Sequence, residues 1–230
     1  RGPHADTMAD HALGMMLNFV RPYFAWKDEQ RKRRWTRIPE DRFLDLHGYN
    51  MGLVGLGDVG IATARRAHGF GMIVYSVDKF PKPSWYKPPE VRESWGLDRL
   101  DEMLALSDWV VVTAPLTPDT RGLLDRRRIS LMKEGVYIIA VSRGNIIDEE
   151  ALIEGLRSGR VAGAGLDVMS VEPLPEDSPL WDMDNVILTP HSAAVSPDRS
   201  IARIEVFKEN LRRFLSDEPF LYVCDKEAGF

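Results

Sequence analysis

The chain has 230 residues, of which 44 % are hydrophobic and 28 % are charged, proportions close to those of globular proteins. They exclude a disordered or collagen-like chain, and the length suits one domain or about one and a half. Thirty basic and thirty-five acidic side chains give a net charge of −5, which argues against nucleic acid as the main partner. A single cysteine, Cys224, excludes an intramolecular disulfide and a multi-cysteine metal site, and fits a reducing, cytoplasmic location.

The first 45 residues combine a helical pattern with a basic stretch. Apolar residues that recur near a 3.6-residue period predict a helix over residues 6–27. Residues 27–37 then contain six basic side chains against two acidic ones, and they could form an anion or nucleic-acid patch. The overall negative charge favours a solvated helix end or a subunit arm instead. The apolar run over residues 12–20 is too short for a membrane span and has no basic flank, so neither a membrane segment nor a secretory signal is expected.

From residue 46 onward, short apolar strands alternate with helices. The predicted strands cover residues 51–54, 72–77, 109–113, 136–141, 162–168 and 186–188. The predicted helices cover residues 58–70, 97–106, 148–158 and 197–216, with helical pieces over 119–132. Residues 78–97 are expected to be irregular because they are rich in proline and tryptophan. This alternation predicts an α/β, doubly wound parallel sheet covered by helices on both faces.

A glycine-rich turn joins the first of these strands to the helix that follows. Gly55, Gly57 and Gly60 form a G-x-G-x-x-G motif, and an acid, Asp78, closes the next strand. In this context the motif predicts a dinucleotide site. Gly55 permits the tight turn, Gly57 lets the backbone approach a pyrophosphate, and Gly60 lets the helix lie close to the strand.

Residues beside this turn decide which dinucleotide is expected. Asp78 can accept hydrogen bonds from both adenosine ribose hydroxyls and would repel a 2′-phosphate, which favours NAD over NADP. Lys79 could meet a phosphate, but an exposed lysine is the simpler interpretation. The free N–H groups at the start of the helix, near Asp58 and Val59, would face the pyrophosphate. The negative charge of Asp58 is expected to weaken that binding without abolishing it.

Polar side chains follow the later predicted strands. Arg143, Asp167 and His191 each come after a strand, and Glu172 follows Asp167 closely. The carboxyl ends of parallel strands line the ligand crevice of such a sheet. These residue types suit hydride transfer from an alcohol, because a histidine can take the hydroxyl proton while a carboxylate stabilises the imidazolium. An arginine can hold a substrate carboxylate in two hydrogen bonds.

The other four histidines have no such context. They lack a nearby carboxylate at a strand end, and we interpret them as structural or exposed residues: His4, His11, His47 and His68. No cluster in the sequence suggests a metal site.

Taken together, these motifs resemble the D-isomer-specific 2-hydroxyacid dehydrogenase family, which includes glyoxylate/hydroxypyruvate reductases, D-lactate dehydrogenases and phosphoglycerate dehydrogenases. The resemblance covers nearly the whole chain, including residues 8–13, residues 115–120 and the ending formed by residues 223–226 with Gly229 and Phe230. It implies an NAD-dependent interconversion of a small D-2-hydroxy acid and its 2-oxo acid. Arg143 would bind the substrate, with His191 as acid/base and Glu172 as its partner. Asp167 would lie near the nicotinamide, and the remaining cofactor contacts would be Thr113, Pro115, Thr120, Ser142, Arg143, His191 and Ala193.

The resemblance also implies how the chain is organised. Residues 1–45 would be a connecting helix and dimerisation arm, with a homodimer formed through residues 6–45. Residues 46–200 would be the Rossmann-type dinucleotide-binding domain. Residues 201–230 would be a closing helix and a tail that returns to a substrate domain, whose N-terminal part is expected to be absent. Whether these 230 residues act alone stays open, and the alternative is a non-catalytic NAD(H)-sensing interaction module of corepressor type.

Two stretches depart from the family pattern. Thr113 and Ala114 precede Pro115 where many members carry a histidine, which is expected to alter the cofactor edge. Residues 192–196 replace the commoner branched and threonine residues after the histidine, and are expected to reshape the nicotinamide pocket.

Overall fold

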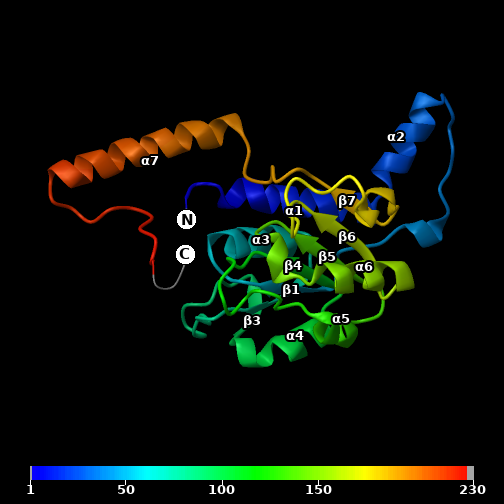
Figure 1. Ribbon diagram of the computed structural model, residues 1–230, viewed down its shortest axis with the longest axis horizontal. Coiled ribbons are helices and arrows are strands. Elements are labelled where there is room, and N and C mark those ends of the chain that lie inside the picture. The colour runs from blue at the N-terminus through cyan, green and yellow to red at the C-terminus, as the bar shows by residue number, and fades with distance from the viewer. Residues whose placement is uncertain (1, 227–230) are drawn as a thin grey trace.

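The computed structural model describes residues 2–226, in which seven strands form one parallel sheet (Figure 1). The strand order is β3-β2-β1-β4-β5-β6-β7, and every neighbouring pair is parallel. Gly229 and Phe230, which belong to the predicted family ending, lie outside the described residues. The strands are β1 (Asn50–Val54), β2 (Ile73–Val77), β3 (Val91–Trp95), β4 (Trp109–Val112), β5 (Val136–Ala140), β6 (Val161–Leu166) and β7 (Val186–Leu188).

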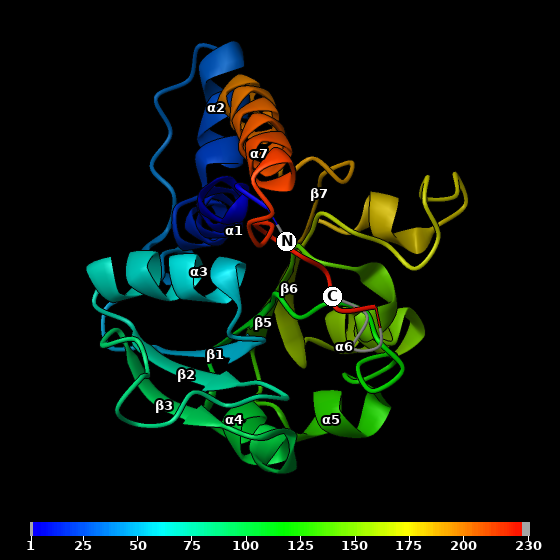
Figure 2. The same cartoon turned by 90° about the vertical axis from the view of Figure 1, so that its left-hand side faces the viewer.

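Helices cover both faces of this sheet, which confirms the predicted α/β, doubly wound architecture. Figure 2 shows α1 and α3 on one face and α4, α5 and α6 on the other. The helices are α1 (Ala5–Val20), α2 (Tyr23–Arg31), α3 (Asp58–Gly69), α4 (Leu100–Leu106), α5 (Arg126–Leu131), α6 (Glu149–Ser158) and α7 (Pro197–Leu215). Short 3₁₀ turns lie at η1 (Glu40–Arg42), η2 (Leu97–Arg99), η3 (Gly144–Ile146) and η4 (Pro179–Asp182).

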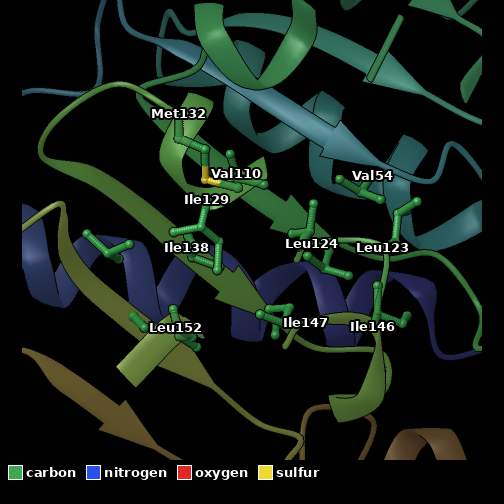
Figure 3. Packing of buried hydrophobic residues seen from close by; sticks show 14 of the residues in the cluster. Val54, Val110, Leu123, Leu124, Ile129, Met132, Ile138, Ile146, Ile147 and Leu152 are labelled. Carbon is green, nitrogen blue, oxygen red and sulfur yellow. The ribbon is translucent and has the colours of Figure 1, made fainter. Parts of the chain in front are cut away.

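The core consists of two apolar layers, one on each side of the sheet. All four residues of β4 are buried, and their side chains alternate between the layers because successive strand residues point to opposite faces. Val110 and Val112 pack with the α5 and α6 side, part of which Figure 3 shows. Trp109 and Val111 pack with α1 and α3 on the opposite side. This burial on both faces explains why the strands read as continuous apolar runs.

The predicted helix over residues 6–27 is wrong in one respect, because it is two helices. α1 ends at Val20, Arg21 is extended with φ −130° and ψ 122°, and α2 begins after Pro22. A proline disfavours the helical conformation in the residue before it and removes a backbone donor, so the chain changes direction there. The consequence is visible in Figure 1, where α2 points away from the sheet.

Two further stretches differ from the prediction. Residues 91–95 form the edge strand β3 inside the segment expected to be irregular. Its sequence, with exposed Arg92 and Glu93, lacks the apolar run that marks the inner strands. Of the helical pieces expected over residues 119–132, only α5 is an α-helix, and Asp125 caps it by accepting a hydrogen bond from the Arg128 N–H at 2.8 Å.

The last helix begins where the sequence predicts. Ser196 caps α7 by accepting a hydrogen bond from the Arg199 N–H at 3.2 Å, and Pro197 occupies its first position. Figure 1 shows α7 extending away from the sheet. Exposed apolar side chains run along it, including Phe207 at 68 % and Leu215 at 77 % exposure. Among residues 2–226, none of the helices has the length and apolar character that crossing a bilayer requires.

Candidate active site

The order of the strands gathers the predicted functional residues around one crevice. β1 lies near the centre, and after β3 at the edge the chain returns to β4 on the other side of β1. Parallel sheets bind ligands at the carboxyl ends of strands beside such a switch point. A cleft of about 810 Å³ lies there, lined by most of the predicted site residues: Gly57, Asp58, Val59, Asp78, Thr113, Pro115, Ser142, Arg143, Asp167, His191 and Ala193.

The glycine turn has the geometry that the motif predicts. Gly55 has φ +102°, and a Cβ at this position would lie 2.6 Å from the backbone nitrogen of Ala114. A Cβ on Gly60 would clash with the carbonyl oxygen of Gly55, so the two close approaches hold α3 directly against the end of β1. At Gly57 nothing lies within 4 Å of the position of a Cβ, and this residue faces the cleft. The turn therefore leaves open backbone at the start of α3, as an anion cradle requires.

Two polar groups in the cleft also fit a dinucleotide. The carboxylate of Asp78 accepts hydrogen bonds from the Leu56 N–H at 2.7 Å and the Phe80 N–H at 2.9 Å, which fix it beside the glycine turn. The hydroxyl oxygen of Ser142 is buried, lines the cleft and has no hydrogen-bond partner among the described residues. Buried polar atoms are nearly always satisfied, so this hydroxyl points to a ligand that would complete its hydrogen bonding.

Two of the predicted contact residues shape the loops around the cleft. Thr113 lines the cleft, and its hydroxyl donates to the carbonyl oxygen of Gly55 at 2.8 Å, joining the ends of β4 and β1. Thr120 is 8 % exposed, and its hydroxyl donates to the Pro115 carbonyl at 2.7 Å while accepting from the Thr117 N–H at 2.7 Å. The structure therefore places Thr120 inside its loop and outside the cleft lining. Its contact with a cofactor stays a prediction.

The expected histidine–carboxylate pair is formed. His191 Nδ1 lies 2.7 Å from Glu172 Oε2, and Glu172 Oε1 accepts a hydrogen bond from the Met169 N–H at 3.1 Å. Partial burial opposes ionisation of Glu172, but the hydrogen bonds from His191 and Met169, with the charges of His191 and Arg143, outweigh it. The pKa of Glu172 is therefore lower than its usual value. Glu172 is an anion whose contact with Nδ1 orients the imidazole of His191.

A buried carboxylate holds the turn that carries His191. Asp167 is 1 % exposed, and it accepts hydrogen bonds from the Ser192 N–H at 2.8 Å and the Ala193 N–H at 2.9 Å. Its carbonyl oxygen also accepts from the His191 N–H at 2.9 Å. His191 itself has φ +50°, a left-handed conformation that is uncommon for residues other than glycine. The backbone of this turn is thus fixed by Asp167 on both sides of the histidine.

One residue of this network was misjudged from the sequence. His11, interpreted as structural or exposed without a carboxylate partner, lies with Nε2 2.9 Å from Thr189 Oγ1 and 3.6 Å from Asp167 Oδ1. Thr189 Oγ1 in turn donates to Asp167 Oδ1 at 2.6 Å. Because 178 residues separate His11 from Thr189, no local pattern could have indicated this contact.

Arg143 also faces the cleft, next to the loop that carries Glu172. Its Nη1 donates to the Ser142 carbonyl oxygen at 2.6 Å, and Arg143 is one of the residues that line the cleft. The neighbouring Gly144 has no room for a side chain, because a Cβ there would clash with the backbone of Met169. This close backbone contact brings the arginine turn against the segment leading to Glu172.

A second cavity, of about 640 Å³, adjoins the first one. Its lining is largely apolar and includes Met169, Leu174 and Trp181, with Glu172 and His191 on its wall. His191 lines both cavities, so it lies between the cleft with the glycine turn and this apolar space. Within the described residues, no group of three or more His, Cys, Asp or Glu side chains is placed to hold a metal ion.

These features define a Rossmann-type dinucleotide-binding domain with a histidine–glutamate pair beside its cleft. A family model described as D-isomer specific 2-hydroxyacid dehydrogenase, NAD binding domain, matches residues 13–193. The chain therefore belongs to the D-isomer-specific 2-hydroxyacid dehydrogenase family.

Individual relatives agree with this assignment. The chain is 37 % identical over 218 residues to a hydroxypyruvate reductase from Blautia hydrogenotrophica, covering 93 % of this chain and 66 % of that protein. It is 35 % identical to a D-3-phosphoglycerate dehydrogenase from Methanocaldococcus jannaschii, covering 92 % of this chain and 40 % of that protein. The chain thus spans 40 to 66 % of the length of these two curated relatives.

The fold is also similar to that of a solved relative. A D-isomer specific 2-hydroxyacid dehydrogenase from Xanthobacter autotrophicus Py2, in complex with NADPH and MES, superimposes with a TM-score of 0.85 at 38 % identity. The match covers 99 % of this chain and 90 % of that one. Together with the family model, it shows that this domain is of the NAD(P)-binding type.

The lowered pKa of Glu172 makes a prediction about acid stability. The native state prefers the ionised form of Glu172 more strongly than the unfolded state does. Above the usual glutamate pKa, this difference contributes fully to the free energy of unfolding. The contribution is lost as the pH falls through the lowered pKa that Glu172 has in the native state. Glu172→Gln should therefore lower the denaturant midpoint at neutral pH, and the gap to the unaltered chain should narrow in acid. Glu176→Gln, an exposed glutamate of the same loop, is the control. An equal gap at both pH values would contradict this account.

Proposed function

We propose that this domain serves an NAD-dependent oxidoreductase that interconverts a small D-2-hydroxy acid and its 2-oxo acid. The observation that carries the proposal is the 2.7 Å pair of His191 and Glu172, of which His191 lines the same cleft as Arg143 and the open glycine turn. Dinucleotide, acid–base pair and carboxylate-binding group are the three parts that such a reaction needs.

His191 would be the acid/base of the reaction. Glu172 engages Nδ1, so Nε2 is the ring atom that can exchange a proton with the substrate. During reduction, Nε2 would donate its proton to the carbonyl oxygen of the 2-oxo acid, and during oxidation the neutral ring would take it back from the hydroxyl. The contact of Glu172 with Nδ1 also fixes the orientation of the ring, which suits this role.

Arg143 would hold the substrate and the residues of the glycine turn would hold the cofactor. A guanidinium can bind a carboxylate in two hydrogen bonds and polarise the neighbouring carbonyl. Gly57, the α3 N-terminus and Ser142 would hold a dinucleotide, whose nicotinamide supplies or accepts the hydride when bound. Curated relatives named glyoxylate reductase and hydroxypyruvate reductase support a small 2-oxo acid as the substrate class. The carboxylate and carbonyl of such an acid match Arg143 and His191.

Asp78 and Lys79 support NAD as the preferred cofactor. The Asp78 carboxylate is fixed at the end of β2, where it would accept hydrogen bonds from ribose hydroxyls and repel a 2′-phosphate. The cation next to it in the chain, Lys79, forms an ion pair with Asp119 at 2.6 Å, while Lys82 lines the cleft. Two solved relatives, from Xanthobacter autotrophicus and Sinorhizobium meliloti, are bound to NADPH and NADP. The proposal therefore assigns this chain a different cofactor preference from the one that those two complexes suggest.

The cofactor proposal predicts the behaviour of an Asp78→Ala variant. The unaltered chain should bind NADH more tightly than NADPH, and Asp78→Ala should narrow the difference, because it removes both the ribose acceptor and the repulsion of the phosphate. Fluorescence titration with each nucleotide measures the two affinities. Asp119→Ala, which releases Lys79, is a matched variant that should raise NADPH affinity alone. Equal affinities in the unaltered chain would show that the ribose assignment is wrong.

The catalytic proposal is tested by a single-turnover experiment. With the chain in excess over NADH, the loss of NADH absorbance on adding glyoxylate or hydroxypyruvate reports hydride transfer directly. His191→Ala should slow it by about 10²- to 10⁴-fold, the usual contribution of general acid–base catalysis, with NADH affinity little changed. An unaffected rate in His191→Ala would refute the role of His191. NADH binding without any turnover in the unaltered chain would favour the NAD(H)-sensing alternative for these 230 residues.

We further propose a homodimer formed through residues 6–45. α2 and the segment after it surround an open apolar cavity of about 1320 Å³, and Tyr23, Phe24 and Trp35 are exposed beside it. Exposed apolar patches of this kind mark interaction sites, and a two-fold axis would let two copies cover each other's patch.

Light scattering should give the mass of two chains at tens of micromolar. Trp35→Asp should shift the protein toward the monomer, because it places a charge in the apolar patch. Trp85→Asp changes a tryptophan that is 84 % exposed elsewhere, and should leave the mass unchanged. A monomeric unaltered chain would contradict the proposal.

A further inference from the structure

We propose that His11 is a positioning residue that fixes the His191 turn through Thr189 and Asp167. The three side chains form a continuous series: His11 Nε2 lies 2.9 Å from Thr189 Oγ1, which lies 2.6 Å from Asp167 Oδ1. Asp167 then binds the backbone of the turn. The catalytic meaning of this series rests on the proposed function, whereas its effect on the turn does not.

The position of the hydrogens follows from the two distances. A threonine hydroxyl has one hydrogen, and the ionised Asp167 carboxylate can only accept. At 2.6 Å, the Thr189 hydrogen must therefore point to Asp167 Oδ1, because two lone pairs would otherwise face each other. Thr189 Oγ1 is then the acceptor from His11, and His11 must carry a hydrogen on Nε2. The structure thus assigns one tautomer to His11 when its ring is uncharged.

This arrangement lets His11 strengthen the hydrogen bond that the Thr189 hydroxyl donates to Asp167, because a hydroxyl that accepts a hydrogen bond is polarised and donates more strongly. Without the donor at Nε2, Thr189 Oγ1 would lose this polarisation and the acceptor side of the hydroxyl would be left unpaired. Asp167 would then have a weaker donor while remaining 1 % exposed, and a buried carboxylate with weaker hydrogen bonds is less well stabilised. The Ser192 and Ala193 N–H groups bind the same carboxylate, so any relaxation of Asp167 moves the backbone beside His191.

The placement of the three residues also connects separate parts of the fold. His11 lies on α1, which packs on the sheet through buried neighbours such as Ala12 and Met15. Thr189 follows β7, and Asp167 follows β6. The His11 side chain is only 23 % exposed, so its ring is held between α1 and the strand ends. Any displacement of α1 would therefore reach the His191 turn through polar contacts as well as through apolar packing.

Hydrogen exchange on the full 230-residue chain tests this inference without requiring activity. His11→Ala should accelerate exchange of the Ser192 and Ala193 amides by about tenfold, the scale of one lost hydrogen bond. Thr189→Val should accelerate exchange at least as much, because it removes the hydroxyl that donates to Asp167 and keeps the shape of the side chain. His11→Gln should restore slow exchange, since its side-chain amide can donate from nearly the same place as Nε2. His68→Ala, an exposed histidine on α3, is the control.

A spectroscopic measurement and the location of the exchange effect separate positioning from general destabilisation. Long-range ¹H–¹⁵N spectra should show the His11 hydrogen on Nε2. Amides of β1 and β4 should exchange at unchanged rates in all variants. Three outcomes would each overturn the inference: unchanged exchange at Ser192 and Ala193 in His11→Ala, failure of His11→Gln to restore it, or equal acceleration throughout the sheet.

The reaction gives an independent reading. In the single-turnover experiment, His11→Ala should slow hydride transfer by about tenfold with NADH affinity little changed, because small displacements of a reacting group are costly. An unchanged rate would remove the catalytic part of the inference. If the unaltered chain shows no turnover, the proposed function fails for this chain, while the exchange experiment still decides whether His11 positions the turn.

Discussion

The candidate active site depends on the hydrogen bonds that the surrounding chain donates to the buried carboxylate of Asp167. This carboxylate lies at the end of β6 and is shielded from solvent, so its charge must be balanced by hydrogen bonds from the surrounding chain. The donors it finds are the Thr189 hydroxyl and the N–H groups of Ser192 and Ala193. Meeting this requirement draws the segment after β7 over the end of β6, and that segment carries His191 toward Glu172.

The residues that the sequence identified are those governed by local rules. Gly55 and Gly60 are required by a turn that leaves no room for a Cβ, and a motif of three glycines reports that requirement directly. Arg143, Asp167 and His191 follow buried apolar strands, and the carboxyl ends of parallel strands share one edge of the sheet. The positions of the strands were therefore enough to predict that these side chains lie close together, even though they are far apart in the chain.

The features that the sequence did not identify depend on tertiary contacts or on a single local interruption. The break between α1 and α2 could have been predicted from the sequence, because a proline at position 22 disfavours a helical conformation at Arg21. The apolar periodicity of the segment obscured this local signal. The edge strand β3 was harder, since an edge strand is half exposed and needs no apolar run. The contact of His11 could not be predicted from the sequence, because its partner Thr189 is 178 residues away and only the packing of α1 on the sheet brings the two together.

Asp58 shows how one residue can stabilise the free domain and oppose its ligand. It is the first residue of α3, where a negative charge interacts favourably with the N-terminal end of the helix, typically by about 0.3–1 kcal/mol. A pyrophosphate bound at the same N-terminus would rely on the same helix dipole and N–H groups, and would also be repelled by the carboxylate. Both effects weaken anion binding at the start of α3, so the cofactor contacts proposed above would have to include groups elsewhere in the cleft.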